Sequence, residues 1–419
     1  MKPSRIPKDR NYLTSLVENC MSRTAKVEAR IENALAQTAT VVVTDTDADA
    51  LATAIAGASD GDVIEVQTNA AYNPVVLPAD KTLIIRAGQG YGPRFTGSRC
   101  IQIADGAECH LVSGFSFENY TTPNPNYNGA AIDFETRNSK ITDVVFHNMS
   151  FGQVTAGSAV MLSYHWSEGG DNYAAPPQLN ELSDTVSFVD CHFCESGAEG
   201  IEGGCLSLRA IAHPLILRCQ INGEEKNSRG IQLQNCTDLL IRDCAARGFG
   251  GGNGEGIKID SIGSPVAVRE SGLVFNCICS ECVEGIDIDD DADVVVLDNL
   301  CFGNTDEGIS IDDSAKCLCV GNVCFDNGVG ILAEAGSVTE MQYNSCFGNT
   351  TDYSILNGYA LPSSNVTNAN NAFRNTVARG IPYTVEDAAD WAVSSPVTVA
   401  QALDRIADAV AGLLAAPIP

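Results

Sequence analysis

The sequence predicts an all-β solenoid, a stack of short coils with a helical segment at each end. Two markers recur with the same period. Asn-x-Cys-Phe-x-Asn occurs at residues 299–304, 322–327 and 344–349, and a copy with Ala in the Cys place occurs at 370–375. Between residues 230 and 331, Gly-Ile begins at residues 230, 256, 285, 308 and 330, so both markers return every 22 to 29 residues there. Two independent markers with one period indicate a repeat array.

Each period contains short β-type runs such as GISI and CLCV, punctuated by Asn, Gly and Asp. These patterns favour short strands joined by turns, and no helical pattern fits inside a period. Stacked coils would pair each strand with its counterpart about 4.8 Å away and place equivalent side chains in ladders. We therefore expect Phe302, Phe325, Phe347 and Phe373 to stack, with Phe rather than the neighbouring Cys pointing inward.

With its Asn turn, short strand, loop and Gly-Ile-x-Ile, the chain resembles the right-handed parallel β-helix proteins of the pectate-lyase-like superfamily. The resemblance covers roughly residues 40–385, with weaker coils at residues 129, 157 and 204. It implies a single right-handed parallel β-helix of about thirteen coils. We expect three parts: an N-terminal helical anchor or oligomerisation segment at 1–38, the β-helix at 39–385, and a C-terminal helical segment at 386–419.

Both ends of the chain carry helical patterns. Residues 49–58 predict a short helix that plugs the open end of the first coil. Two longer segments show apolar residues at alternating intervals of four and three, and Thr398 with Gln401 offers a capping box before the second. These seams would either fold back over the ends of the β-helix or, as we prefer, join three chains in a homotrimer. The first comprises Leu13, Val17, Cys20, Thr24, Val27, Ile31 and Ala34, and the second Val399, Leu403, Ile406, Val410 and Leu413.

Composition limits the partners. The 53 acidic and 25 basic residues give a net charge of −28, which repels nucleic acid and anionic membranes. No apolar stretch approaches the length of a membrane span, so no membrane insertion is expected. MKPSRIPKDR is followed by no apolar run, so no signal peptide is expected. Most of the seventeen cysteines are then expected to be free, buried thiols.

The tail DWAVSSPVTVAQALDRIADAVAGLLA resembles a short C-terminal segment common in tailed-phage virion proteins. With a helical start and a β-helix body, the chain as a whole resembles a phage tailspike, fibre or head-decoration protein. This resemblance implies a structural role at the virion surface after synthesis in the host cytoplasm. Its implied partners are further copies of itself, other virion proteins through the helical ends, and a host cell-surface polysaccharide.

An acidic column is expected on one exposed face. If both isoleucine-type positions of Gly-Ile-x-Ile-z point inward, x and z face out. Lys258 then lies among carboxylates, and further acids follow in the turns. The nearest outward acids are Asp260, Asp287, Asp289 and Asp312, and those of the turns are Asp290, Asp291, Asp293 and Asp313.

Three roles for the column remain open besides that of a solvated face. Lys258 would neutralise part of it; Ca²⁺ would bind at Asp289, Asp290, Asp312 and Asp313; or one protonated acid would act beside an ionised partner. The superfamily resemblance implies that this strand lines a polysaccharide cleft, with paired carboxylates in hydrolases and Arg or Lys with Ca²⁺-binding acids in lyases. The catalytic candidates are Lys258, Asp260, Asp287, Asp289 and Asp312. No cofactor is required by the structural role, and the chain lacks the Gly-His-Gly of polygalacturonases.

Two loops that break the period offer aromatic and acidic groups to a glycan. Residues 163–182 and 119–129 would flank the outward strand, and aromatic faces stack on sugar rings. The alternative is that their aromatic side chains pack on their own coils. The expected glycan-binding residues are Tyr127, Tyr164, Trp166, Glu168, Tyr173 and the outward Arg209. The leading function is thus a structural virion protein, and the alternative is a polysaccharide lyase or glycoside hydrolase.

Overall fold

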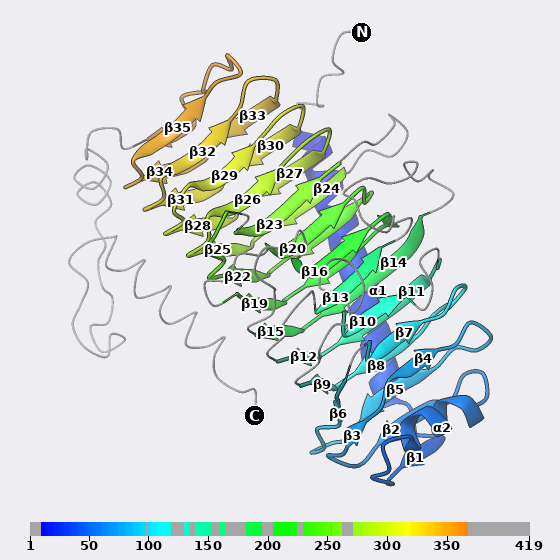
Figure 1. Cartoon of the computed structure of the whole chain (residues 1–419). Helices are drawn as coiled ribbons and strands as arrows, with labels where there is room; N and C mark the ends of the chain where they lie inside the picture. Colours follow the sequence, from blue (N-terminus) through cyan, green and yellow to red (C-terminus); the bar gives the residue numbers. More distant parts are fainter. Residues whose placement is uncertain are drawn as a thin grey trace, which may run out of the picture.

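Three parallel sheets wind around one axis as a right-handed parallel β-helix (Figure 1). The computed structural model describes residues 10–97, 99–118, 130–134, 139–152, 159–163, 182–194, 204–223, 229–252, 254–261 and 271–367. The sheets contain 13, 12 and 11 strands, and we call them sheets A, B and C. The fold class is as predicted. Sheet C has eleven strands, so the described residues form at most eleven complete coils, fewer than the roughly thirteen expected.

Each coil contributes one strand to each sheet in turn. Sheet A contains β1 (Val41–Val43), β2 (Val63–Val66), β5 (Ile84–Ala87), β8 (Leu111–Ser113), β11 (Thr142–His147), β14 (Ser183–Val189), β17 (Ile211–Ala212), β18 (Leu215–Leu217), β21 (Leu239–Arg242), β24 (Ser271–Phe275), β27 (Asp293–Leu297), β30 (Lys316–Val320) and β33 (Val338–Gln342). Sheet B contains β3 (Ala71–Tyr72), β6 (Arg94–Phe95), β9 (Ser116–Phe117), β12 (Ser150–Phe151), β15 (His192–Cys194), β19 (Gln220–Asn222), β22 (Ala245–Arg247), β25 (Ile278–Ser280), β28 (Leu300–Phe302), β31 (Val323–Phe325), β34 (Ser345–Phe347) and β36 (Val366–Thr367). Sheet C contains β4 (Val75–Leu77), β7 (Ile101–Ile103), β10 (Ile132–Phe134), β13 (Val160–Ser163), β16 (Gly204–Arg209), β20 (Arg229–Gln234), β23 (Glu255–Asp260), β26 (Glu284–Ile288), β29 (Glu307–Ile311), β32 (Val329–Ala333) and β35 (Thr351–Ile355).

Helix α1 (Arg10–Ala36) lies along the outer face of sheet A, behind the strands in Figure 1. Its seam residues Cys20, Val27 and Ile31 are buried against a row of outward apolar side chains that includes Leu240 and Leu273. The helix therefore folds back along one side of the stack, not over an end. Because the seam is buried within its own chain, it no longer supports the predicted homotrimer contact.

The two ends of the core are also covered. Helix α2 (Ala50–Gly57) buries Leu51 and Ile55 against the first coils, as the plug predicted at 49–58 requires. At the other end, Tyr353, Tyr359 and Leu361 are partly buried and pack against the core. The predicted C-terminal helical segment at 386–419 and Phe373 lie outside the described residues. Neither α1 nor α2 is both long and apolar enough to span a bilayer.

The phenylalanine ladder forms, but it faces outward. Phe302 and Phe325 stack at 5.0 Å between ring centroids, and Phe325 and Phe347 at 5.3 Å. The neighbouring Cys301 and Cys324 are fully buried, so the prediction that Phe points inward is wrong. The interior is narrow here because glycines of sheet C face the cysteines: a Cβ added at Gly308 would lie 3.2 Å from that of Cys324. A phenyl ring would not fit in that space.

The inward ladder of sheet B changes along the stack. Phe117, Phe151 and Phe193 are aligned and buried in the early coils. The same ladder continues through smaller side chains until it consists of Cys279 and its successors. All seventeen cysteines are free, and all but Cys109 and Cys194 are buried. The thiols therefore act as small apolar residues of the core, as expected.

The repeated asparagines form two buried ladders. In the first, the Asn322 side chain donates to Val296 O and to Asn344 Oδ1, and its own Oδ1 accepts from Asn299. The second runs through Asn304, Asn327 and Asn349. Each amide thus satisfies backbone and side-chain groups at a turn that would otherwise lack partners. The Asn-x-Cys-Phe-x-Asn marker is therefore explained: its asparagines hold the turns, Cys fills the core and Phe covers the outside.

Replacement of Asn322 by Ala should lower the free energy of unfolding by about 3 kcal/mol, because buried Asn299 N and Val296 O lose their side-chain partner, and Asn344 Oδ1 keeps only the bond from the backbone N of residue 322. Asn69→Ala is the control, because Asn69 is exposed and its Oδ1 accepts one hydrogen bond, from Gly92 N. That change should cost less than about 1 kcal/mol in denaturant unfolding. Equal costs for the two variants would refute the structural role of the ladder.

Candidate functional site

The strand register of sheet C places the predicted column as expected. Lys258 on β23 pairs with Asp287 on β26, and Asp287 pairs with Ser310 on β29. The isoleucines on either side, such as Ile286 and Ile288, are fully buried in the core. The polar side chains between them therefore face away from the core, which confirms the register inferred from Gly-Ile-x-Ile.

Most of this column is buried, although it was predicted to be exposed. Asp287 is 2% exposed, Lys258 8% and Arg209 2%, and Asp260 is also buried. Arg209 is thus enclosed, with its Nη2 3.4 Å from Gln232 Oε1, which contradicts its predicted contact with a glycan. Strand alternation determines on which side a side chain lies, but not what covers that side. The other predicted glycan-binding residues, Tyr127, Tyr164, Trp166, Glu168 and Tyr173, lie outside the described residues.

Lys258 is the cation at the centre of the site. Its Nζ donates to Asp287 Oδ2 and, at 2.8 Å, to Asp289 Oδ2. Burial lowers the pKa of Lys258, but the attraction of Asp287 and Asp289 outweighs it and holds the pKa above its ordinary value. Glu255 Oε1 lies 3.9 Å from the same Nζ, and Glu255 also pairs with Arg229 at 3.1 Å. Lys258 is therefore a fixed ammonium that anchors two carboxylates.

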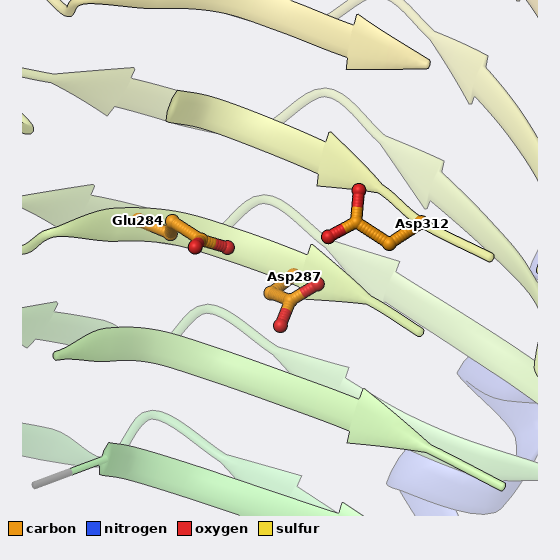
Figure 2. Close-up of side chains that lie close together, drawn as sticks. All are labelled: Glu284, Asp287 and Asp312. Carbon is orange, nitrogen blue, oxygen red and sulfur yellow. The ribbon is translucent and has the colours of Figure 1, made fainter. Parts of the chain in front are cut away.

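Three carboxyl groups converge beside this cation. Figure 2 shows Glu284 and Asp287 on β26 and Asp312 just beyond β29. One oxygen from each lies within 4.8 Å of the others. The Oδ1 atom of Asp287 is buried and has no hydrogen-bond partner, whereas Asp312 Oδ1 accepts from Ser310 at 2.8 Å. Glu284 and Asp312 are partly exposed, although Glu284 Oε2 is buried and also has no hydrogen-bond partner. The trio thus combines an enclosed carboxyl with two partly exposed ones.

Glu284 was not among the predicted site residues, because the predicted column contains only positions that follow Gly-Ile. Glu255 pairs with Glu284 and Ile257 with Ile286 on the neighbouring strand. A Cβ added at Gly285 would contact the inward Cys279. The residue before the glycine therefore faces out. A signal was present: three successive described strands of sheet C begin with Glu-Gly-Ile, so that Glu255, Glu284 and Glu307 occupy this position in successive coils.

The pKa values of these carboxyl groups are raised. Burial, then repulsion from Asp287 and Glu255, raises the pKa of Glu284 to about 9. Burial also raises the pKa of Asp287 above its ordinary value, against the attraction of Lys258. Burial raises the pKa of Asp312 to about 6, although the hydrogen bond from Ser310 opposes this. Of the two partly exposed carboxyl groups, Glu284 therefore keeps its proton to a higher pH than Asp312, which is the order of pKa values needed for acid–base chemistry.

The predicted calcium ligands belong to two separate groups. Asp312 is part of the trio, whereas Asp289, Asp290 and Asp313 form a second cluster with one oxygen each within 4.8 Å. In that cluster Asp290 N donates to Asp289 Oδ1 at 2.6 Å, and burial raises the pKa of Asp290 to about 6. Asp260, expected beside Lys258, is buried one coil away from both clusters. Burial raises its pKa despite nearby Lys258 and Arg209.

Comparisons with known families and solved structures give distant matches. The family described as "Right handed beta helix region" matches residues 181–344. Among solved structures, the A-module of a mannuronan C-5 epimerase from Azotobacter vinelandii is 13% identical with a TM-score of 0.42, over 78% of this chain and 95% of that one. A pectate lyase is 13% identical with a TM-score of 0.40, over 78% of each chain. Tailspike protein 3 of bacteriophage CBA120 is 11% identical with a TM-score of 0.35, over 78% of this chain and 61% of that one. No curated protein matches the sequence.

The raised pKa of Glu284 predicts a pH dependence of stability. Folded protein retains this proton up to about pH 9, whereas the unfolded chain loses it near the ordinary value of 4.5. Stability is thus highest below that ordinary value and falls as the pH rises towards 9. Glu284→Gln should make the fall in melting temperature between about pH 5 and pH 9 smaller.

The matched control for this prediction is Glu281→Gln, because Glu281 is exposed and pairs only loosely with Arg247, at 3.5 Å. Its melting temperature should follow that of the native protein at every pH. A Glu284→Gln variant with the native pH dependence would show that this carboxyl is ionised in the folded protein at neutral pH.

Proposed function

We propose that the protein is a glycoside hydrolase that cleaves a polysaccharide between Glu284 and Asp312. The observation that carries the proposal is geometric. Two partly exposed carboxyl groups from neighbouring coils converge on the same point of the outer face of sheet C, with their oxygens within 4.8 Å. Sugar hydrolysis requires such a pair, one acid and one carboxylate, on either side of the scissile bond.

The two groups have different roles. Protonated Glu284 donates its proton to the glycosidic oxygen as that bond breaks, and ionised Asp312 stabilises or attacks the positive anomeric carbon. Oxygens within 4.8 Å leave little room for a water molecule between them. This spacing favours direct attack by Asp312, a glycosyl-enzyme ester and its later hydrolysis, with net retention of configuration.

Asp287 and Lys258 position this pair without reacting. Asp287 is enclosed and is held by Lys258 Nζ, which also binds Asp289. The buried Asp287 carboxyl repels Glu284 and so contributes to its raised pKa. Removal of Lys258 would leave buried carboxylates without a counter-charge and would disturb the arrangement of the whole site.

The environment of Lys258 argues against the lyase alternative. A lyase needs a base that removes a proton from the sugar ring, and a lysine can serve only after it loses its own proton. Lys258 is 8% exposed, and two carboxylates hold its pKa above the ordinary value. It is therefore charged and enclosed at neutral pH. Among the candidates the carboxyl pair fits hydrolysis better than Lys258 fits elimination.

The second candidate function is structural: a spike, fibre or head decoration at the surface of a phage particle. Its support is the resemblance of the tail at residues 390–415 to virion proteins. In this setting the outer face of sheet C would bind a host-surface polysaccharide without cleaving it. Homotrimer formation and contacts with other virion proteins then belong to the C-terminal seam, because α1 uses its own seam within the chain.

Hydrolysis is tested on a panel of bacterial capsular polysaccharides by the release of reducing ends. Glu284→Gln and Asp312→Asn should each lower kcat by about 10² or more, because each removes one half of the pair. Asp326→Asn is the control, since Asp326 is exposed and lies on a turn of sheet B. Absorbance at 235 nm that depends on Lys258 would replace hydrolysis with elimination, and binding without any cleavage would leave the structural function.

Calcium is tested separately, because a cation is the other way to relieve the repulsion within the trio. If Ca²⁺ binds there, millimolar Ca²⁺ should raise the melting temperature, and Glu284→Gln with Asp312→Asn should abolish that rise. If the rise in melting temperature persists in that double variant but disappears in the double variant Asp290→Asn with Asp313→Asn, the ion binds at the second cluster. No rise in the native protein would exclude calcium as a cofactor at millimolar concentration.

A further inference from the structure

The outer face of sheet B is apolar over its later coils. Two columns of side chains face away from the core there, and each member is half-buried. Their inward neighbours, such as Cys279 and Cys301, fill the core. Of the two described helices, α1 lies on sheet A and α2 at the first coils, so neither covers this face. The first column consists of Ile278, Leu300 and Val323, and the second of Phe302, Phe325 and Phe347.

The shape of this face does not suit a sugar. The planes of Phe302 and Phe325 differ by 3°, as do those of Phe325 and Phe347, with centroids 5.0 and 5.3 Å apart. The rings cover one another's faces, so their edges point outward. A sugar stacks on an aromatic face, whereas ring edges and aliphatic side chains form ridges into which apolar side chains of a helix can pack.

Helix α1 shows how such a face is covered in this protein. Its seam residues follow one another at a mean interval of roughly 3.5 residues, which corresponds to about 5.2 Å along a helix. Stacked strands lie about 4.8 Å apart. A helix laid along the stack can therefore place one seam residue over each coil, as Val27 and Ile31 do against the leucines of sheet A. In this fold a 4,3 seam fits the outside of a sheet.

We propose that residues 397–414 form a second outer helix of the same chain and pack along this face of sheet B. The seam of that segment, Val399, Leu403, Ile406, Val410 and Leu413, has the same 4,3 spacing as the seam of α1. Five seam residues span about 21 Å, and the coils from β25 to β34, which carry the two columns, span about 14 Å. The seam is therefore long enough to cover the whole apolar face.

The path of the chain agrees with this placement. The last described strand, β36, pairs with β34 at the end of sheet B. The connection to residue 397 thus begins on the same sheet. Its 29 residues, 368–396, could extend to roughly 95 Å, far more than the length of the face. Thr398 and Gln401 provide the capping box that would start the helix.

The test is limited trypsin digestion of the full-length protein, followed by mass spectrometry. Arg405 lies within the proposed helix and Arg379 in the connection, so Arg379 is an internal reference. Cleavage after Arg405 should be at least tenfold slower than cleavage after Arg379. Phe325→Ser should bring the two rates together, although residue 325 is 80 positions away from Arg405 in the sequence.

Leu403→Asp should have the same effect and leaves every strand of the β-helix unchanged, so it remains informative if Phe325→Ser fails to fold. Asp408→Asn lies on the opposite side of the helix from the seam and should retain protection. Equal rates in the native protein would overturn the proposal. Sedimentation of the same samples identifies another occupant: if the native protein is a trimer that Phe325→Ser or Leu403→Asp converts to monomers, the face binds a second copy and the intramolecular proposal is wrong.

Discussion

The spacing of about 4.8 Å between stacked strands is the constraint on which the rest of this structure depends. It makes each residue the nearest neighbour of its counterpart one coil away. Whether that repetition stabilises the stack depends on the side chain. Asn322 gains from it because one amide can donate to and accept from the next. Phe325 gains because flat rings stack at nearly this distance. Buried thiols fit because they are small and need no partner.

The same spacing makes a column of acids costly. Carboxylates one coil apart repel one another, and burial removes the water that would screen them. The chain relieves part of this cost with Lys258, which reaches Asp287 and Asp289 at once. One ammonium cannot neutralise every acid, so Glu284 keeps a proton, and its pKa rises to about 9. The proposed reactive pair therefore arises because Lys258 neutralises only part of the repulsion between the stacked carboxylates.

Outer helices follow from this spacing as well. The rise of a helix over one seam interval is close to the distance between coils, so an amphipathic helix can cover a sheet from one coil to the next. Helix α1 does so on sheet A, where it also binds the stack through charged groups. Arg30 contacts Asp143, and Arg218 pairs with Glu28 of the helix at 2.6 Å. The heptad pattern of α1, which resembles that of a coiled coil, here serves to pack the helix along the outside of the β-helix.

The sequence by itself determined the repeat, the parallel β-helix and the register of sheet C, because period and alternation are local properties of the chain. It placed Lys258, Asp287 and Asp289 together for the same reason. Only the tertiary structure decided what depends on surroundings. It turned Cys301 inward and Phe302 outward because Gly285 and Gly308 leave no room for a ring. It packed the seam of α1 against sheet A of the same chain. It also buried Asp287 and Arg209, although the alternation of the strand predicts only that these side chains point away from the core. Burial and pKa depend on what lies above a strand, and the residues of that strand do not encode it.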